Sequence, residues 1–146
     1  MKTIKLLTSL LVLTGVVMLA SCATSSDSNT KSASKDVLYT CGCGPDCKCS
    51  TVSTTAGKCG CGHALVAGKV KKVEGDTALL CMCGPTCGCE LDPKDATKCG
   101  CGKPIKKASL KGTGIYFCNC GGSCTCNTVS AQPDKCKCGM ALKKAD

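Results

Sequence analysis

Cysteine is the residue type in this sequence whose number and spacing point to chemistry. The chain has 146 residues, of which 19 are cysteine and only one is histidine. Eighteen cysteines form three sets of six, and each set obeys the spacing C-x-C-x3-C-x-C-x9-C-x-C. The distance between sets varies while the spacing inside them does not, which indicates that the six cysteines of a set act together. The sets are Cys41, Cys43, Cys47, Cys49, Cys59 and Cys61; Cys81, Cys83, Cys87, Cys89, Cys99 and Cys101; and Cys118, Cys120, Cys124, Cys126, Cys136 and Cys138.

This spacing predicts metal binding by thiolates. In an extended chain residues i and i+2 point to the same face, so each C-x-C pair is expected to direct two sulfurs toward one ion. Soft thiolates select zinc, Cu(I) and their heavier relatives over magnesium or calcium. Six thiolates exceed one tetrahedral site, and they suit either a small cluster with shared thiolates or one four-coordinate site with an extra pair. We expect zinc or Cu(I) as the cofactor, with all 18 cysteines as ligands.

Two other side chains are candidates for auxiliary ligands. His63 lies two residues after the last cysteine of the first set, and Met140 occupies the same slot in the third set. The second set has Lys103 in this slot, so the slot is not a fixed ligand position. A thioether such as Met140 or Met82 would serve at most as a weak ligand for Cu(I).

The charged residues agree with this interpretation. All 19 basic residues are lysine, and 17 of them follow the first 21 residues, against 10 acidic residues. Two divalent ions on six thiolates leave a formal charge of about −2, so three loaded sets would bring the chain close to neutrality. Lysines beside cysteines would also favour the thiolate form by lowering the thiol pKa; they are Lys48, Lys58, Lys98 and Lys137. The absence of arginine and the scarcity of aromatic residues argue against a nucleic-acid partner.

The N-terminus predicts export and lipid anchoring. A lysine-containing start precedes a run rich in leucine and valine over residues 6–19, which is too short for a spanning helix and is typical of a signal peptide. The sequence Leu19-Ala20-Ser21-Cys22 resembles the lipobox of bacterial lipoproteins. This resemblance implies cleavage after residue 21, acylation of Cys22 and a lipid anchor in the membrane. With Ala23 next, it implies a place at the bacterial cell envelope, on the outer membrane facing the periplasm.

The rest of the chain divides by composition. Residues 22–35 lack large apolar side chains and predict a lipidated, disordered tether. Three cysteine-rich modules are expected at 36–66, 81–106 and 116–144, joined by linkers at 67–80 and 107–115. Short apolar stretches before each set predict brief strands. The expected fold is therefore three small repeats of β-hairpins and loops, stabilised by metal or by disulfides, with a helix at the signal peptide and little helix elsewhere.

A large hydrophobic core is not expected. Leu, Ile, Val and Phe supply only 16 of the 125 residues from position 22 onward, a share too low to offset the entropy of ordering the chain. The apolar residues that flank each set are expected to form small satellite clusters over the sulfur centre, with metal-sulfur bonds in place of a core.

Parts of each set resemble a known family. The opening Tyr39-Thr40-Cys41-Gly42-Cys43-Gly44-Pro45, and the closing runs Gly57-Lys58-Cys59-Gly60-Cys61-Gly62 and Pro133-Asp134-Lys135-Cys136-Lys137-Cys138-Gly139-Met140, resemble the small bacterial heavy-metal-binding domain of copper and heavy-metal efflux proteins. The resemblance implies metal binding, a metal-efflux system as partner, and ligands at the first cysteine and the closing pair of each set. Extra cysteines and the shortened closing C-x-C give the modules a metallothionein-like composition.

The main alternative is a surface lipoprotein stapled by disulfides without metal, because an exported chain with an even number of remaining cysteines is ordinarily read that way. Cysteines two residues apart are too close for an unstrained bridge, so the bridges would have to cross turns. Enzymatic activity is not expected. The sequence has no C-x-x-C redox motif, and one histidine cannot build a histidine-rich catalytic zinc site.

Overall fold

The described part of the molecule is built entirely from strands, turns and loops. The computed structural model describes residues 34–44, 48–120 and 126–146. Within these ranges the regular elements are β1 (Val37–Cys41), β2 (Val52–Ser53), β3 (Leu65–Glu74), β4 (Thr77–Cys81), β5 (Ile105–Ser109), β6 (Tyr116–Phe117), β7 (Val129–Ser130) and β8 (Lys143–Lys144). The prediction of short strands and loops is confirmed for these residues. None of their elements is a helix long and apolar enough to cross a membrane.

Several predictions concern residues outside the described ranges. They are the signal peptide at 1–21, the lipidated Cys22, most of the tether, and the candidate ligands Cys47 and Cys124.

The larger sheet has five antiparallel strands in the order β2-β1-β3-β4-β5. Its centre is the β3–β4 hairpin, which turns at Gly75, a residue with φ of 56°. This hairpin occupies most of 67–80, the segment expected to be a linker. Valines alternating with lysines on β3 and the apolar run of β4 have the pattern of paired strands with one buried face. The segment between the first two cysteine sets is therefore the middle of a sheet.

An irregularity in β3 affects what lies next to it. The register between β3 and β4 shifts between Val70 and Lys72, which leaves Lys71 as an extra residue in β3. A bulge of this kind redirects the side chain of the extra residue. The side chain of Lys71 therefore does not follow the regular alternation of side chains along β3.

The smaller sheet has three antiparallel strands in the order β7-β6-β8, and it shares one core with the larger sheet. This core differs from the separate satellite clusters expected from the sequence. The scarce apolar residues of all parts of the described chain converge in it, because each alone would bury too little surface. Its buried members are Leu38, Val70, Ala78, Leu80, Ala108, Leu110, Ile115, Phe117, Val129 and Ala145.

A second, smaller cluster agrees with the expectation. Leu142, the aliphatic residue four positions after the third set, packs with the buried Cys118 and Cys136, and Tyr116 lies against them. One satellite cluster of the expected kind is thus present beside the third cysteine set.

Hydrogen bonds also join distant parts of the chain. The amide of Val129 in β7 donates to the carbonyl of Lys35 (2.6 Å), and the amide of Leu110 donates to the carbonyl of Asp76 (2.7 Å). The side-chain amide of Asn127 donates to the carbonyl of Val70 (2.7 Å). The sheets therefore form one scaffold.

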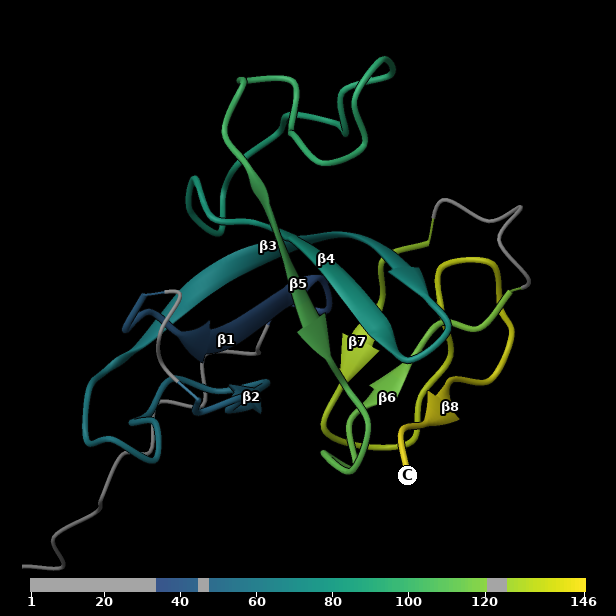
Figure 1. Cartoon of the computed structure of the whole chain (residues 1–146). Coiled ribbons are helices and arrows are strands. Elements are labelled where there is room, and N and C mark those ends of the chain that lie inside the picture. The colour runs from purple at the N-terminus through teal and green to yellow at the C-terminus, as the bar shows by residue number, and fades with distance from the viewer. Residues whose placement is uncertain (1–33, 45–47, 121–125) are drawn as a thin grey trace, which may run out of the picture.

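The cysteine-bearing loops leave this scaffold in three directions. In Figure 1 the loop between β1 and β3 lies at lower left, the loop between β4 and β5 at the top, and the loops after β6 at the right. The three cysteine sets are consequently held apart from one another around a common core.

Candidate metal-binding centre

The closing C-x-C pair of each set lies in a tight turn with the same backbone hydrogen bonds. The amide of the first closing cysteine donates to the carbonyl four residues later, and the amide of a glycine three residues on donates back to the cysteine carbonyl. The donor-acceptor pairs are Cys59–His63 and Gly62–Cys59, Cys99–Lys103 and Gly102–Cys99, and Cys136–Met140 and Gly139–Cys136, at 2.7–2.9 Å. This turn places two sulfurs on one side of a narrow hairpin.

The glycine is required by the turn's backbone. Gly62, Gly102 and Gly139 have φ values of 82°, 77° and 84°. This left-handed conformation costs other residues about 1–2 kcal/mol, because their Cβ approaches the carbonyl oxygen. The glycine after each set is therefore a structural requirement of the sulfur arrangement.

The opening C-x-C pair follows the end of a strand. Cys41 ends β1, Cys81 ends β4 and Cys118 directly follows β6. These strands contain the apolar stretches that precede each set, so the shared core fixes the position of the first sulfur. The side chains of Cys41, Cys81 and Cys118 are buried. The first cysteines of the closing turns are buried too: Cys59, Cys99 and Cys136.

Six C-x-C pairs of the described residues contain an N–H···S hydrogen bond. The amide of Cys43 donates to the Sγ of Cys41 at 3.4 Å. The same bond from the second cysteine to the first occurs in the pairs that begin at Cys59, Cys81, Cys87, Cys99 and Cys118. The closing pairs thus converge through turns, and not through the extended geometry that the sequence suggested. An amide donor stabilises the negative thiolate.

The opening and closing pairs come together in groups able to hold a metal ion. In the first set four sulfurs lie within 4.8 Å of one another, and the second set has the equivalent four. In the third set two groups of three share Cys136. The groups are Cys41, Cys43, Cys59 and Cys61; Cys81, Cys83, Cys99 and Cys101; Cys118, Cys126 and Cys136; and Cys120, Cys136 and Cys138.

The sulfur separations of the first set match a tetrahedral site. Cys43 Sγ lies 3.7 Å from Cys59 Sγ and 3.9 Å from Cys61 Sγ, and the last two are 3.6 Å apart. Four sulfurs at about 2.3 Å from a zinc ion, in a tetrahedron, are about 3.8 Å from one another. The donor type and these separations are compatible with a metal ion held by thiolates.

The other sets are more compact. Cys83 Sγ lies 3.8 Å from Cys99 Sγ and 3.0 Å from Cys101 Sγ. In the third set Cys120 Sγ lies 3.6 Å from Cys136 Sγ and 3.1 Å from Cys138 Sγ. The structure places no disulfide between described cysteines.

The middle C-x-C pairs lie beside these groups. Cys87 Sγ is 3.4 Å from Cys81 Sγ, and the thiol of Cys89 is hydrogen-bonded to Cys87 and Cys101. In the first set Cys49 contacts Cys59. In the third set Cys126 belongs to the group with Cys118 and Cys136. The partners Cys47 and Cys124 lie outside the described residues.

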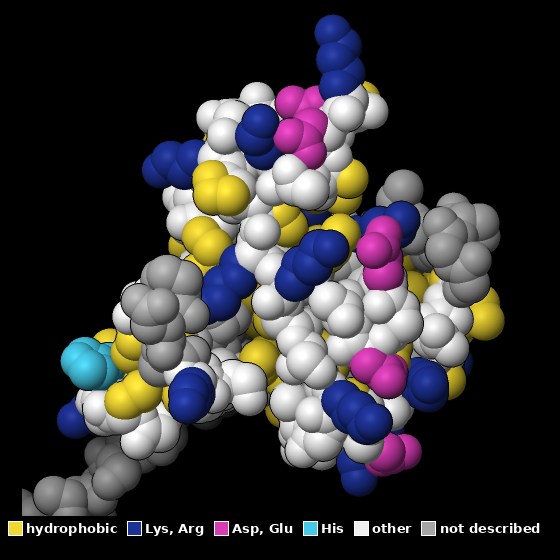
Figure 2. All heavy atoms as spheres, in the orientation of Figure 1, with side chains coloured by type: hydrophobic (Ala, Val, Ile, Leu, Met, Phe, Trp, Pro, Cys, Tyr) yellow, Lys and Arg dark blue, Asp and Glu magenta, His cyan; other side chains and the backbone are white. Residues whose placement is uncertain are grey.

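The two auxiliary candidates lie at the surface. His63 and Met140 are exposed, and Met140 has 55% of its surface accessible. The histidine is the cyan side chain in Figure 2. Among the described residues, His63 belongs to none of the metal-capable groups. The backbone carbonyls of His63 and Met140 nevertheless serve the site, because they accept the amide hydrogen bonds of the closing turns.

Convergence of the thiols separates their pKa values. The thiol of Cys101 and its backbone amide donate to Cys99 and, against the effect of burial, lower the pKa of Cys99 to about 6. The donor role of Cys89 toward Cys87 raises the pKa of Cys89 to about 11. Burial raises the pKa of Cys81 and Cys118. A thiolate forms first where neighbouring donors converge, and its negative charge then opposes the ionisation of the next thiol.

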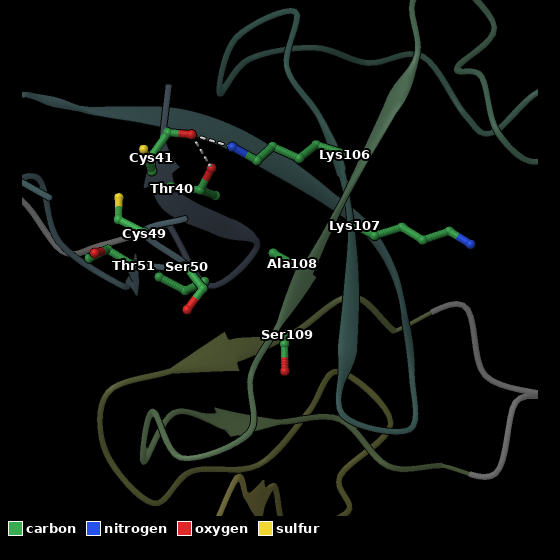
Figure 3. Close-up of a pocket in the computed structure, with 10 residues that line it drawn as sticks. Thr40, Cys41, Cys49, Ser50, Thr51, Lys106, Lys107, Ala108 and Ser109 are labelled. Carbon is green, nitrogen blue, oxygen red and sulfur yellow. Dashed lines mark hydrogen bonds between the residues drawn. The ribbon is translucent and has the colours of Figure 1, made fainter. Parts of the chain in front are cut away.

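The lysines that meet the cysteine loops are not the ones expected from the sequence. Lys106 in β5 donates to the carbonyl of Cys41 at the end of β1, beside the pocket drawn in Figure 3, whereas Lys107 points away. Lys71, the extra residue of β3, donates to the carbonyl of Cys87 at 3.0 Å. The pKa of the Cys87 thiol is lowered mainly by hydrogen bonds from the amide of Cys89 and the thiol of Cys81. The positive charge of Lys71 lowers it further.

Two of the lysines that the sequence placed beside cysteines pair with other side chains. Lys98 forms an ion pair with Asp95 (3.1 Å), and Lys137 donates to Asn127 (3.0 Å). Lysines are spread over the face in Figure 2 without forming one patch. Lys71 and Lys106 are distant from their cysteine partners in sequence, and the register shift at Lys71 depends on strand pairing, so no local sequence signal indicates them.

Comparison of the chain with protein-family models, with curated proteins and with solved structures found no match.

The closing turn supplies a matched pair of test positions. In Gly62→Ala the new side chain must adopt a left-handed backbone, so we expect cadmium affinity of the first set to fall by about 5- to 30-fold, the equivalent of about 1–2 kcal/mol. Gly60→Ala lies in the same turn without positive φ and with open space around its Cβ, and it should leave the affinity unchanged. Competition with a chelator measures both. Equal effects at the two positions would contradict the role assigned to the turn.

Proposed function

We propose that this protein binds soft metal ions through cysteine thiolates and sequesters or buffers them at the bacterial cell envelope. The observation that carries the proposal is the group Cys41, Cys43, Cys59 and Cys61. Three of its sulfur separations, 3.6, 3.7 and 3.9 Å, are close to the edge of about 3.8 Å expected for a tetrahedral zinc site. Zinc and Cu(I) are the ions we favour, because both prefer thiolate donors.

The burial pattern favours binding and release over a permanently enclosed structural ion. In the first two sets the first cysteine of the opening and closing pairs is buried, while the second is exposed. Buried thiolates fix the ion's position against the core, and exposed ones keep it accessible to water or to a partner's ligands. A metal-efflux system that accepts the ion is the partner we propose on this basis.

A binding role without catalysis is consistent with the donor set. Catalytic zinc sites have three protein ligands and an open position for water or substrate. The first two sets each offer four sulfurs to one ion, so such an ion would be coordinatively complete. The same closeness would permit disulfides under oxidation, which is why a metal-free stapled lipoprotein is the alternative to be tested.

Metal loading separates these two functions. We expect the full-length chain, purified anaerobically in detergent, to carry zinc or copper, and its thiols to react with an alkylating reagent only after a chelator removes the metal. Native mass spectrometry and metal analysis measure the loading. A metal-free chain whose mass is lower by two hydrogens per cysteine pair would establish the stapled alternative instead.

The location is tested at the predicted lipidation site. We propose that Cys22 carries the anchor, on the strength of the run Leu19-Ala20-Ser21-Cys22. Cys22→Ser should move the protein from the membrane fraction to the soluble fraction without changing metal bound per chain. Cys43→Ser is the matched control, since it should reduce metal binding and leave the chain in the membrane. A Cys22→Ser protein that stays in the membrane fraction would rule out this anchor.

A further inference from the structure

The second cysteine set is described in full, and its six sulfurs form one group of four with two further sulfurs in contact with it. The group consists of Cys81, Cys83, Cys99 and Cys101, all within 4.8 Å of one another. One tetrahedral ion would use all four of these sulfurs. Cys87 and Cys89 are then left over, although both contact the group.

These two cysteines complete a second ring of sulfurs. Cys87 Sγ lies 3.4 Å from Cys81 Sγ, and the thiols of Cys87 and Cys89 contact each other. Cys89 in turn contacts Cys101, and Cys101 lies within 4.8 Å of Cys81. Every neighbouring pair around the ring Cys81, Cys87, Cys89 and Cys101 is therefore in proximity. The two rings share one edge, between Cys81 and Cys101.

We propose that the second set holds two divalent soft metal ions, with Cys81 and Cys101 bridging them. Cys83 and Cys99 complete the coordination of the first ion, and Cys87 and Cys89 complete that of the second. Six sulfurs then satisfy two tetrahedral ions, because two sulfurs count for both. Loading converts six thiols and two divalent ions into a cluster of charge −2 and releases six protons. This inference rests on the proposed function and specifies the site further.

The surroundings of the second ion fit this arrangement. Cys81 is fully buried at the end of β4, so one bridging sulfur is fixed by the core. The bulged Lys71 donates to the carbonyl of Cys87 at 3.0 Å. It thereby holds the loop of the middle pair against β3 and places a positive charge beside a cluster whose net charge is negative.

The third set shows a related sharing of sulfur. Its two groups, Cys118 with Cys126 and Cys136, and Cys120 with Cys136 and Cys138, have Cys136 in common. One sulfur of the third set is thus placed to serve two donor groups.

Three double substitutions in the full-length chain test the bridge, and each removes two thiols. With cadmium as the probe, Cys87→Ser with Cys89→Ser should lose one ion per chain, and so should Cys83→Ser with Cys99→Ser. Cys81→Ser with Cys101→Ser removes both bridges and should lose two. One isolated four-sulfur site with an idle pair gives losses of none, one and one instead, and this result would overturn the proposal. Native mass spectrometry under anaerobic conditions counts the ions.

A measurement on the unsubstituted chain keeps the proposal testable if a variant fails to fold. Loaded with cadmium-113, two ions joined by a bridging thiolate should show mutual splitting of their nuclear magnetic resonance signals, which disappears in Cys81→Ser with Cys101→Ser. Cadmium signals without any mutual splitting would contradict the bridge while leaving metal binding intact. A reduced chain that binds no cadmium would instead contradict the proposed function itself.

Discussion

The close approach of cysteine sulfurs is the constraint on which the rest of the structure depends. Four sulfurs within 4.8 Å of one another cannot all be ionised without a cation, because each pair of unit charges near 4 Å repels by about 4 kcal/mol at the effective dielectric constant of a protein surface. Hydrogen bonds among the thiols already separate their pKa values: donation from Cys101 lowers the pKa of Cys99 to about 6, and donation to Cys87 raises the pKa of Cys89 to about 11. Soft cations remove the repulsion and supply bonds, so the arrangement favours the metal-loaded thiolate state.

The fold meets this constraint by anchoring each sulfur group to a scaffold that contains little apolar material. Leu38, Leu80 and Phe117, one from each strand that precedes a cysteine set, are fully buried in a single core. Small domains of low apolar content are marginal by themselves. Because the core is shared, the same few apolar side chains support all three cysteine-bearing loops. The hydrogen bond from the Lys106 side chain to the Cys41 carbonyl further attaches the end of β1 to β5, which is distant in sequence.

The sequence predicts the chemistry and the local elements better than the way the elements assemble. The strands before each set follow from their apolar stretches, and the C-x-C spacing predicts that sulfurs converge. It does not predict that the opening pair meets the closing pair. The turns at Gly62, Gly102 and Gly139 have a visible signal, the glycine after each closing pair. The closing pairs nevertheless converge in turns that use N–H···S bonds, which the extended-chain argument did not foresee.

Assembly escaped prediction because it depends on contacts between distant residues. The β3–β4 hairpin lies in a segment that resembled a linker, since its lysines lower the mean hydropathy although Val70, Leu79 and Leu80 are buried. The role of Lys71 depends on a register shift that only strand pairing determines. His63 and Met140 were attractive as ligand types, yet the closing turn uses their carbonyls and leaves their side chains exposed.

The central claim is that these thiolates coordinate soft metal ions directly, and X-ray absorption at the zinc edge of the zinc-loaded, full-length chain tests it most directly. The structure predicts an all-sulfur first shell of four sulfurs at about 2.3 Å from zinc. A first shell made of nitrogen and oxygen donors, or a reduced chain that takes up no zinc, would contradict the account.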